Sequence, residues 1–252
     1  MPRNAHRKSV EPSDERLRNV TIHHTLLDIV AWLSALLATW VIYRWRFRER
    51  LHRFSAKLDA GYFAAITIGG LVGAFGFGTL NAYLSGQPLI ARSVLGGLVG
   101  AITLVEVYKR HKGIVGSTGA VFSVPFCLAM AIGRLGCFQA GLDDMTHGTV
   151  TNLPWGVDFG DALKRHPVQL YEALTMVVVG LVLLLGIGAR SRFFLVNAFY
   201  LAMGAYGLQR FFWEFLKPYA TVVGPFNLFQ FLCLALCAYA SWMVYSGYGE
   251  RT

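Results

Sequence analysis

The sequence predicts an all-α integral membrane protein with seven transmembrane helices, its N-terminus outside and its C-terminus in the cytoplasm. Hydrophobic residues make up 55% of the 252 positions and charged residues only 15%, whereas soluble domains are about 25% charged. The mean hydropathy is +0.47, and the apolar residues form runs close to the 20 or so that a spanning helix needs. These properties exclude a disordered chain, a disulfide-rich secreted module and an ordinary cytosolic enzyme.

Seven apolar runs define the predicted helices, at 24–43, 62–84, 94–108, 117–135, 168–188, 193–212 and 226–245. We expect a polar N-terminal tail (1–22), a seven-helix domain (23–246) with an outer-face loop (136–165), and a short cytoplasmic tail (247–252). The first run is followed by a basic cluster and lacks a small-residue cleavage site, so it does not resemble a signal peptide. Glycines in the second and third runs indicate close helix packing. Alternatively, Gly96 and Gly97 let a substrate approach the backbone.

Lysines and arginines predict the orientation, because cytoplasmic loops carry an excess of both. The loops after the first, third and fifth helices and the C-terminus hold twelve, against six on the opposite side when the N-terminal tail is left out. The tail opposes this bias with five basic residues of its own. The net charge of +9 is thus mostly concentrated in loops that face anionic lipid. Nucleic-acid binding is not expected.

Polar residues from three predicted helices meet at the outer face. Arg134 and Arg210 end helices that run outward, and His166 precedes Pro167 at the start of one that runs inward. A helix N-terminus favours anions, and guanidinium groups bind phosphate with paired donors. This combination predicts a site for a phospholipid headgroup in the outer leaflet.

Helical spacing links further polar residues. Arg210 and Glu214 share a face and can pair, which is also consistent with a purely interfacial ion pair. Gln169 and Glu172 share a face of the fifth helix. Glu106 is expected to form a local ion pair with a neighbouring basic residue, Lys109 or Arg110. The four cysteines show no zinc spacing, and neither a metal, a cofactor nor a disulfide is expected.

Four motifs in order resemble the prolipoprotein diacylglyceryl transferase family. They are Gly-Arg-Leu-Gly-Cys-Phe at 133–138, Leu-Pro-Trp-Gly at 153–156, Arg-His-Pro-Val-Gln-Leu-Tyr-Glu-Ala at 165–173 and Gly-Leu-Gln-Arg-Phe-Phe-Trp-Glu-Phe at 207–215. The resemblance extends over more than half of the chain, and the third motif is the most specific. It implies the same seven-helix topology in a bacterial inner membrane, with the active site facing the periplasm.

The resemblance implies an enzyme that moves the diacylglyceryl group of phosphatidylglycerol onto the lipobox cysteine of a prolipoprotein, forming a thioether and releasing glycerol phosphate. Its partners are therefore phosphatidylglycerol, a prolipoprotein signal peptide and membrane lipids. The implied catalytic residues are Arg134, Arg210, Glu214 and His166. The implied substrate-binding residues are Gly133, Gly136, Cys137, Asp143, Gln169, Tyr171, Glu172, Gly96 and Gly97.

Three positions depart from the family pattern. Leu95 replaces a histidine that is a candidate base in the family, Cys137 replaces an asparagine, and Leu142 replaces a glutamate. Either His166 or Asp143 then serves as the base, or the chain is a divergent member with a different acceptor. Cys137 is either a small residue in the asparagine position or a reactive thiol. A non-catalytic lipid-binding or transport protein on the same fold is the further alternative.

Overall fold

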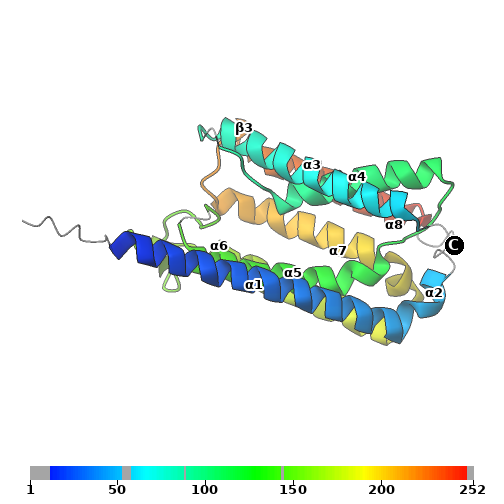
Figure 1. The fold of residues 1–252 in the computed structure, drawn as a ribbon. Helices are drawn as coiled ribbons and strands as arrows, with labels where there is room; N and C mark the ends of the chain where they lie inside the picture. Colours follow the sequence, from blue (N-terminus) through cyan, green and yellow to red (C-terminus); the bar gives the residue numbers. More distant parts are fainter. Residues whose placement is uncertain (1–11, 53–57, 88, 143–144, 249–252) are drawn as a thin grey trace, which may run out of the picture.

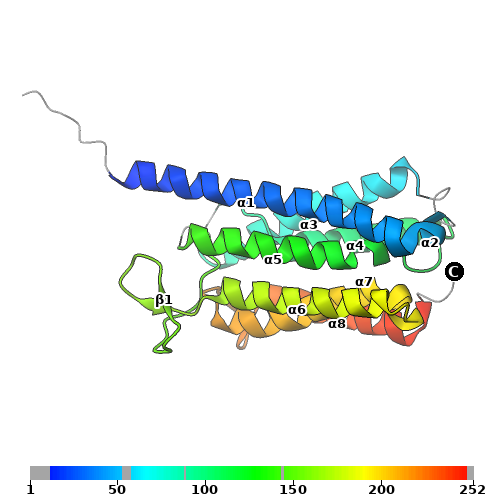
Figure 2. The same cartoon turned by 90° about the horizontal axis from the view of Figure 1, so that it is seen from below.

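The structure, a computed structural model, describes residues 12–52, 58–87, 89–142 and 145–248. Long helices run roughly parallel or antiparallel to one another (Figures 1 and 2), with short hairpins at one end and α2 with the C-terminus at the other. The long helices are α1 (Pro12–Ile42), α3 (Ala60–Leu84), α4 (Val94–His111), α5 (Ser123–Ala140), α6 (Val168–Gly188), α7 (Arg192–Trp213) and α8 (Leu228–Tyr245). We call the two ends of this bundle the hairpin end and the α2 end.

Helix α1 starts earlier than expected, since Pro12 opens it and part of the predicted polar tail is therefore helical. Residues 1–11 lie outside the described part of the chain. The helix continues through a π-helical turn, η1 (Tyr43–Phe47), into the short α2 (Arg48–His52). Phe47 in this turn is completely buried, so the wide turn directs an aromatic ring into the core, while Arg44 is exposed and Arg46 is partly buried.

Helices α3 and α4 pack backbone against backbone through their glycines. A Cβ atom on Gly73 would lie 2.2 Å from the carbonyl oxygen of Gly96, and one on Gly69 would lie 2.5 Å from that of Gly100. A side chain at any of these positions would separate the helices, as expected for small-residue helix contacts in membranes. Ser93 caps α4 by accepting a hydrogen bond from the Gly96 amide.

The apolar core lies among α4–α8 and the end of α1. Its completely buried members include Leu95, Met176, Ala198, Tyr206 and Cys233. Helix α8 begins with a capping box, in which Asn227 and Gln230 satisfy each other's backbone amides. Arg210, close to the end of α7, lies over the ring of Phe229 at 5.5 Å, and this contact joins the two helices at the hairpin end.

Two small hairpins extend the hairpin end. The first pairs β1 (Val157–Asp158) with β2 (Lys164–Arg165) inside the loop between α5 and α6. The second pairs β3 (Thr221–Val223) with β4 (Phe226–Asn227), between α7 and α8. Short 3-10 turns, η3 (Ala120–Phe122) and η4 (Glu214–Leu216), precede α5 and follow α7. Helix α5 extends to Ala140, so the loop expected at 136–165 starts later than predicted.

Within the described part of the chain, five helical segments are long and apolar enough to cross a membrane: Thr25–Arg50, Ala60–Leu84, Ala120–Ala140, Val168–Gly188 and Leu228–Tyr245. Helices α4 and α7 form where the sequence predicted them. They carry more polar side chains, including Glu106 and Lys109 in α4 and Asn197 and Arg210 in α7. The chain is therefore a multi-pass membrane protein, and both the count of seven spans and their orientation stay predictions.

Candidate functional site

Glu172, on the first turns of α6, lies among three basic side chains. Its Oε2 is 2.7 Å from Nε of Arg134 on α5. Its Oε1 is 2.8 Å from Nζ of Lys217 and 3.7 Å from Nη1 of Arg210 on α7. One carboxylate thus connects two helices and the segment that follows η4, so it fixes the relative positions of all three basic groups.

Glu214 forms the second acidic centre. Its Oε1 is 3.0 Å from Nη2 of Arg210 and 3.4 Å from Nζ of Lys217. Its Oε2 accepts a hydrogen bond of 3.1 Å from the Asn227 side chain. The pairing of Arg210 with Glu214 that the helical spacing allowed is therefore present. Because Asn227 also caps α8, this contact ties the acidic centre to the start of that helix.

We call Arg134, Glu172, Arg210, Glu214 and Lys217 the charge cluster. All five are buried, with at most 6% of any residue exposed. Burying charges costs several kcal/mol each unless they are paired, and here two carboxylates face three cations. The net charge of about +1 leaves the cluster able to accept one more anion.

Lys217 lies beyond the end of α7, and its surroundings have opposing effects on the pKa of its amine. Burial lowers the pKa of its amine below the ordinary value, and Arg210 lowers this pKa further, while Glu172 and Glu214 oppose both effects. A further anion entering the cluster would compensate the excess positive charge that Arg210 and Arg134 impose on this amine.

Polar groups without partners surround the cluster. Both side-chain polar atoms of Gln169, the hydroxyl of Tyr206 and Nε of Arg210 are buried and have no hydrogen-bond partner among the described residues. Tyr206 is close enough to both guanidinium groups to interact with them electrostatically. Buried polar atoms are normally satisfied, so these atoms are available to a bound ligand.

His166 does not join the charge cluster. Its Nδ1 is 3.4 Å from the hydroxyl of Tyr171, which also accepts a hydrogen bond of 2.8 Å from the Trp155 indole. The Tyr171 ring packs on Trp213 with 5.2 Å between centroids. His166 and Tyr171 therefore form an aromatic group next to the cluster, in which the histidine is only partly buried.

Among the other predicted residues, those of α5 lie close to the cluster. Nη1 of Arg134 is 3.8 Å from Sγ of Cys137. Gly136 is buried, and a Cβ atom on Gly133 would find no neighbour within 4 Å. Asp143 lies outside the described residues. A side chain at Gly133, the residue before Arg134 in the sequence, would therefore meet open space.

Gly96 and Gly97 have a packing role in the structure. A Cβ atom on Gly96 would lie 2.5 Å from the Gly73 carbonyl oxygen, and one on Gly97 would lie 3.3 Å from that of Gly70. Leu95, where the family resemblance places a histidine, is completely buried in the apolar core. The start of α4 therefore offers no titratable side chain at position 95.

Sequence reasoning missed Lys217 and Asn227 as members of the site. Lys217 continues the helical spacing of Arg210 and Glu214 by three residues, and that spacing was a usable signal. Asn227 precedes Gln230 by three residues just before an apolar run, which is a recognisable capping pattern. The unpartnered hydroxyl of Tyr206 had no comparable signal, since an apolar helix often contains tyrosine.

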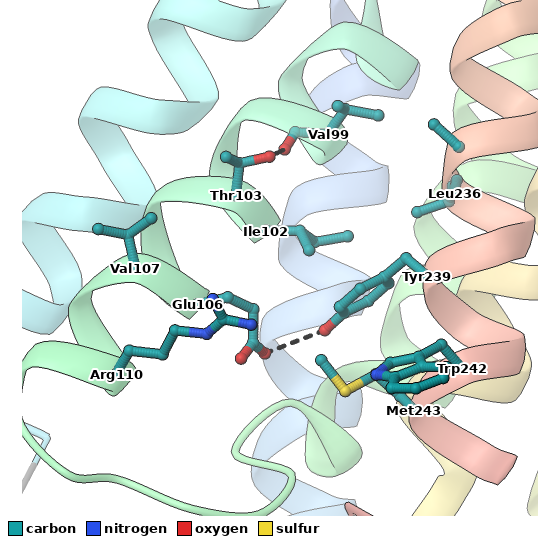
Figure 3. Close-up of a pocket in the computed structure, with 11 residues that line it drawn as sticks. Val99, Ile102, Thr103, Glu106, Val107, Arg110, Leu236, Tyr239, Trp242 and Met243 are labelled. Carbon is teal, nitrogen blue, oxygen red and sulfur yellow. Dashed lines mark hydrogen bonds between the residues drawn. The ribbon is translucent and has the colours of Figure 1, made fainter. Parts of the chain in front are cut away.

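A cavity of about 370 Å³ lies between α4 and α8, and Figure 3 shows its lining. Most of its lining is apolar, and Tyr239 donates a hydrogen bond of 3.0 Å to Glu106 within it. Glu106 also pairs with Lys109 at 2.9 Å, which confirms the expected local ion pair. Its lining includes none of the residues predicted for the site. The cavity is therefore separate from the charge cluster.

A backbone hydrogen bond attaches the loop that carries β1 and β2 to the end of η4. The Thr149 amide donates to the Leu216 carbonyl at 2.7 Å. Within the loop, Arg165 of β2 pairs with Asp161 through Nε and Nη2 at 3.0 and 2.6 Å. The hydrogen bond from Arg165 lowers the pKa of the Asp161 carboxyl below its ordinary value. This pair therefore ties the turn between β1 and β2 to the end of β2.

The sequence matches a known protein family. A family model described as prolipoprotein diacylglyceryl transferase matches residues 29–246. The chain belongs to the prolipoprotein diacylglyceryl transferase family. It is accordingly a transferase of lipoprotein biosynthesis.

Relatives of this family come from several bacteria, and each is called phosphatidylglycerol–prolipoprotein diacylglyceryl transferase. The one from Coxiella burnetii is 31% identical over 227 residues, covering 82% of each chain. That from Geobacter sulfurreducens is 34% identical over 181 residues, 66% of this chain and 68% of its own. That from Methylococcus capsulatus is 27% identical over 242 residues, 88% and 90% of the two chains. The match to the diacylglyceryl transferase family thus includes all the residues of the charge cluster.

Proposed function

We propose that the chain transfers the diacylglyceryl group of phosphatidylglycerol to the thiol of a prolipoprotein cysteine, and that the charge cluster binds the phosphate of the donor. The family relationship supports the reaction. The observation that supports the site is the excess of buried positive charge: three cations face two carboxylates. A phosphodiester supplies the one negative charge that is lacking.

The chemistry requires a thiolate, because the thiolate is the nucleophile. Its sulfur attacks the glyceryl carbon next to the phosphate, a carbon–sulfur bond forms, and the carbon–oxygen bond to the phosphate breaks. Glycerol phosphate leaves with the electron pair of that bond. The thiol proton passes to a base, for which His166 and Asp143 are the candidates from the sequence.

Arg134 and Arg210 are the groups suited to the leaving phosphate. Donors fixed in advance and directed at developing charge account for much of enzymatic rate enhancement. Glu172 and Glu214 fix both guanidinium groups, while Nε of Arg210 and the hydroxyl of Tyr206 remain without partners among the described residues. In this proposal the carboxylates hold the arginines in place, and the unpartnered donors bind the phosphate oxygens.

Access to the cluster is proposed from the face of α5. Arg134 and Arg210 are almost completely buried, so the donor has to reach them through a local opening. The open space beside Gly133 is next to Arg134 in the sequence and offers that route. The chain is proposed to orient the cluster toward the periplasm, where the cysteine of a secreted prolipoprotein is accessible.

The test uses purified full-length protein, phosphatidylglycerol with a labelled diacylglyceryl group and a peptide that carries a lipobox cysteine. We expect label on the peptide. In the Arg210→Ala variant the rate should fall about 100- to 1,000-fold, as expected on removing one such donor. Arg92→Ala, an exposed arginine outside the cluster, is the matched control and should leave the rate unchanged.

Three outcomes contradict parts of this proposal. An active Arg210→Ala variant would rule out the site. Consumption of phosphatidylglycerol without a labelled peptide would point to another acceptor, which the replacement of the family histidine by Leu95 makes a specific alternative. Binding of the lipid without any turnover would favour the alternative of a non-catalytic lipid-binding protein.

A further inference from the structure

The α2 end of the bundle carries a basic and aromatic surface that the proposed reaction does not use. It combines the turn after α1 with the turn between α6 and α7. Residues 44–50 contain four arginines and one glutamate, and Arg190 and Arg192 belong to the second turn. We call Arg44, Arg46, Arg48, Arg190 and Arg192 the basic surface.

Direct contacts join the two turns. Nη2 of Arg46 donates a hydrogen bond of 3.2 Å to the carbonyl of Gly188. The Trp45 ring would lie 3.3 Å from a Cβ atom on Gly188. Arg190 follows two residues later, so the arginines of both turns lie on one part of the molecule, at the end of the bundle where Figures 1 and 2 show α2.

Aromatic rings hold two of these arginines. The Arg44 guanidinium lies 5.3 Å from the Trp40 ring and that of Arg46 lies 4.2 Å from the Trp45 ring. Such contacts orient a cation and leave its charge in place. Both tryptophans are exposed, at 57% and 45%. Tryptophan with arginine at this level is typical of the membrane–water interface.

Arg190 has an unusual backbone conformation. Its amide donates to the carbonyl of Ile187 at 3.1 Å, and that of Ser191 donates to Gly186 at 3.2 Å. These bonds form a Schellman turn, in which the residue after the C-cap is usually glycine. Arg190 has a φ of 56°, a left-handed conformation that is unfavourable for a residue with a Cβ. Because glycine adopts this conformation at a lower energetic cost, an arginine at this position indicates that its side chain has a function.

An apolar surface adjoins the arginines. Leu33, Leu36, Leu37 and Trp40 of α1 are all more than half exposed. A ligand that contacts both the arginines and this apolar surface must be apolar along α1 and negatively charged at the turns. This requirement excludes a purely ionic ligand such as free phosphate. Basic residues at a membrane surface attract anionic lipids.

From these observations we propose that the basic surface binds the headgroup of an anionic phospholipid whose chains lie along α1. The charge cluster lies at the hairpin end, so this lipid is distinct from the donor and is not consumed. The proposal does not depend on the proposed reaction, since neither turn contributes to the charge cluster.

The test is lipid binding to the purified full chain in detergent, followed by native mass spectrometry with phosphatidylserine and phosphatidylcholine. We expect a preference for phosphatidylserine. Arg190→Gly should weaken phosphatidylserine binding about fivefold, and Arg44→Gln/Arg190→Gly about 25-fold, given the contribution of each basic residue at a bilayer surface. Phosphatidylcholine binding should not change.

The charge control is Arg92→Gln/Lys164→Gln, which removes two exposed charges elsewhere and should change phosphatidylserine binding less than twofold. Arg190→Gly should also raise the temperature of thermal unfolding, because glycine relieves the backbone strain. Ala162→Gly, at a position with a φ of 61°, should raise that temperature without loss of lipid binding. Weaker phosphatidylserine binding in the Arg190→Gly variant, together with a higher unfolding temperature, would therefore not result from a loss of folding.

Brominated lipids locate the bound molecule. Brominated phosphatidylserine should quench more fluorescence in the wild type than in Trp40→Phe/Trp45→Phe, and brominated phosphatidylcholine should show less of this difference. No preference of the wild type for phosphatidylserine would overturn the proposal. Equal losses of phosphatidylserine binding in Arg44→Gln/Arg190→Gly and in Arg92→Gln/Lys164→Gln would also overturn it. Fluorescence quenching that does not depend on these two tryptophans would have the same consequence.

Discussion

Single residues determine the electrostatics of the site, and Glu172 is the most important of them. It pairs with Arg134 and Lys217 within 2.8 Å and approaches Arg210, so its loss would leave like charges facing one another in a buried space. The cost of breaking a buried ion pair arises mainly from the partner left without compensation. Glu172 therefore has a structural task whatever its part in binding.

We expect Glu172→Gln to lower the free energy of unfolding by about 3–5 kcal/mol. Arg134 would lose the carboxylate with which it pairs, and Lys217 would lose the nearer of its two carboxylates. Lys217→Gln in the same chain should restore part of this loss, since it removes one of those cations. A double-mutant cycle of unfolding in detergent measures the coupling. Additive effects of the two substitutions would show that the pair does not interact.

Pairs of helices are held by different means in different parts of the molecule. Helices α3 and α4 meet through glycines, where backbone contacts leave no space for a side chain. Helices α7 and α8 meet through larger groups, including Arg210 over Phe229 and the Gln230 side chain, which donates a hydrogen bond of 3.3 Å to the Phe211 carbonyl. The α3–α4 contact is therefore the more sensitive to an added methyl group.

Gly73→Ala should reduce the stability by about 1–3 kcal/mol, because the new Cβ would lie 2.2 Å from the Gly96 carbonyl oxygen and overpacking of this kind has such a cost. Gly76→Ala is the matched control on the same helix, since a Cβ there meets nothing within 4 Å. It should be neutral or slightly stabilising, because alanine favours helix. Thermal unfolding of both variants in detergent compares them, and equal effects would argue against the glycine contact.

The whole molecule has two chemically different ends. The hairpins lie at one end of the bundle and α2 lies at the other (Figures 1 and 2). The charge cluster, which includes residues at the start of α6 and the end of α7, belongs to the hairpin end, and the basic surface belongs to the α2 end. Excess lysine and arginine at one side of a membrane protein orients it with that side in the cytoplasm. The predicted orientation therefore places the charge cluster toward the periplasm and the basic surface toward the inner leaflet.

Cysteine labelling of intact cells tests this orientation. Ala162→Cys, in the exposed turn between β1 and β2, should react with a membrane-impermeant maleimide from outside. His111→Cys, exposed at the end of α4, should react only after the cells are made permeable. The parent chain, with its four cysteines, supplies the background. The reverse pattern would invert the topology and place the charge cluster on the cytoplasmic side.

Much of the fold was predictable because a bilayer restricts what a chain can do: apolar runs must form helices. All seven predicted runs correspond to helices, with α1 longer than expected and α4 and α7 more polar than the others. The pairing of Arg210 with Glu214 was predictable as well, since both lie on one helix. Local spacing from Glu214 and to Gln230 was a usable signal for Lys217 and Asn227. Their contacts with Glu172 and Glu214, which place them in the site, cross from one element to another.

The sequence by itself determined the class of protein, the helices and the family, because composition, apolar runs and local motifs are properties of the chain. Only the tertiary structure decided that Glu172 is the centre of three cations, that His166 contacts Tyr171, and that the end of α6 contacts the turn after α1. These relations join residues far apart in sequence. Their distances depend on how the helices pack, which helical periodicity does not specify.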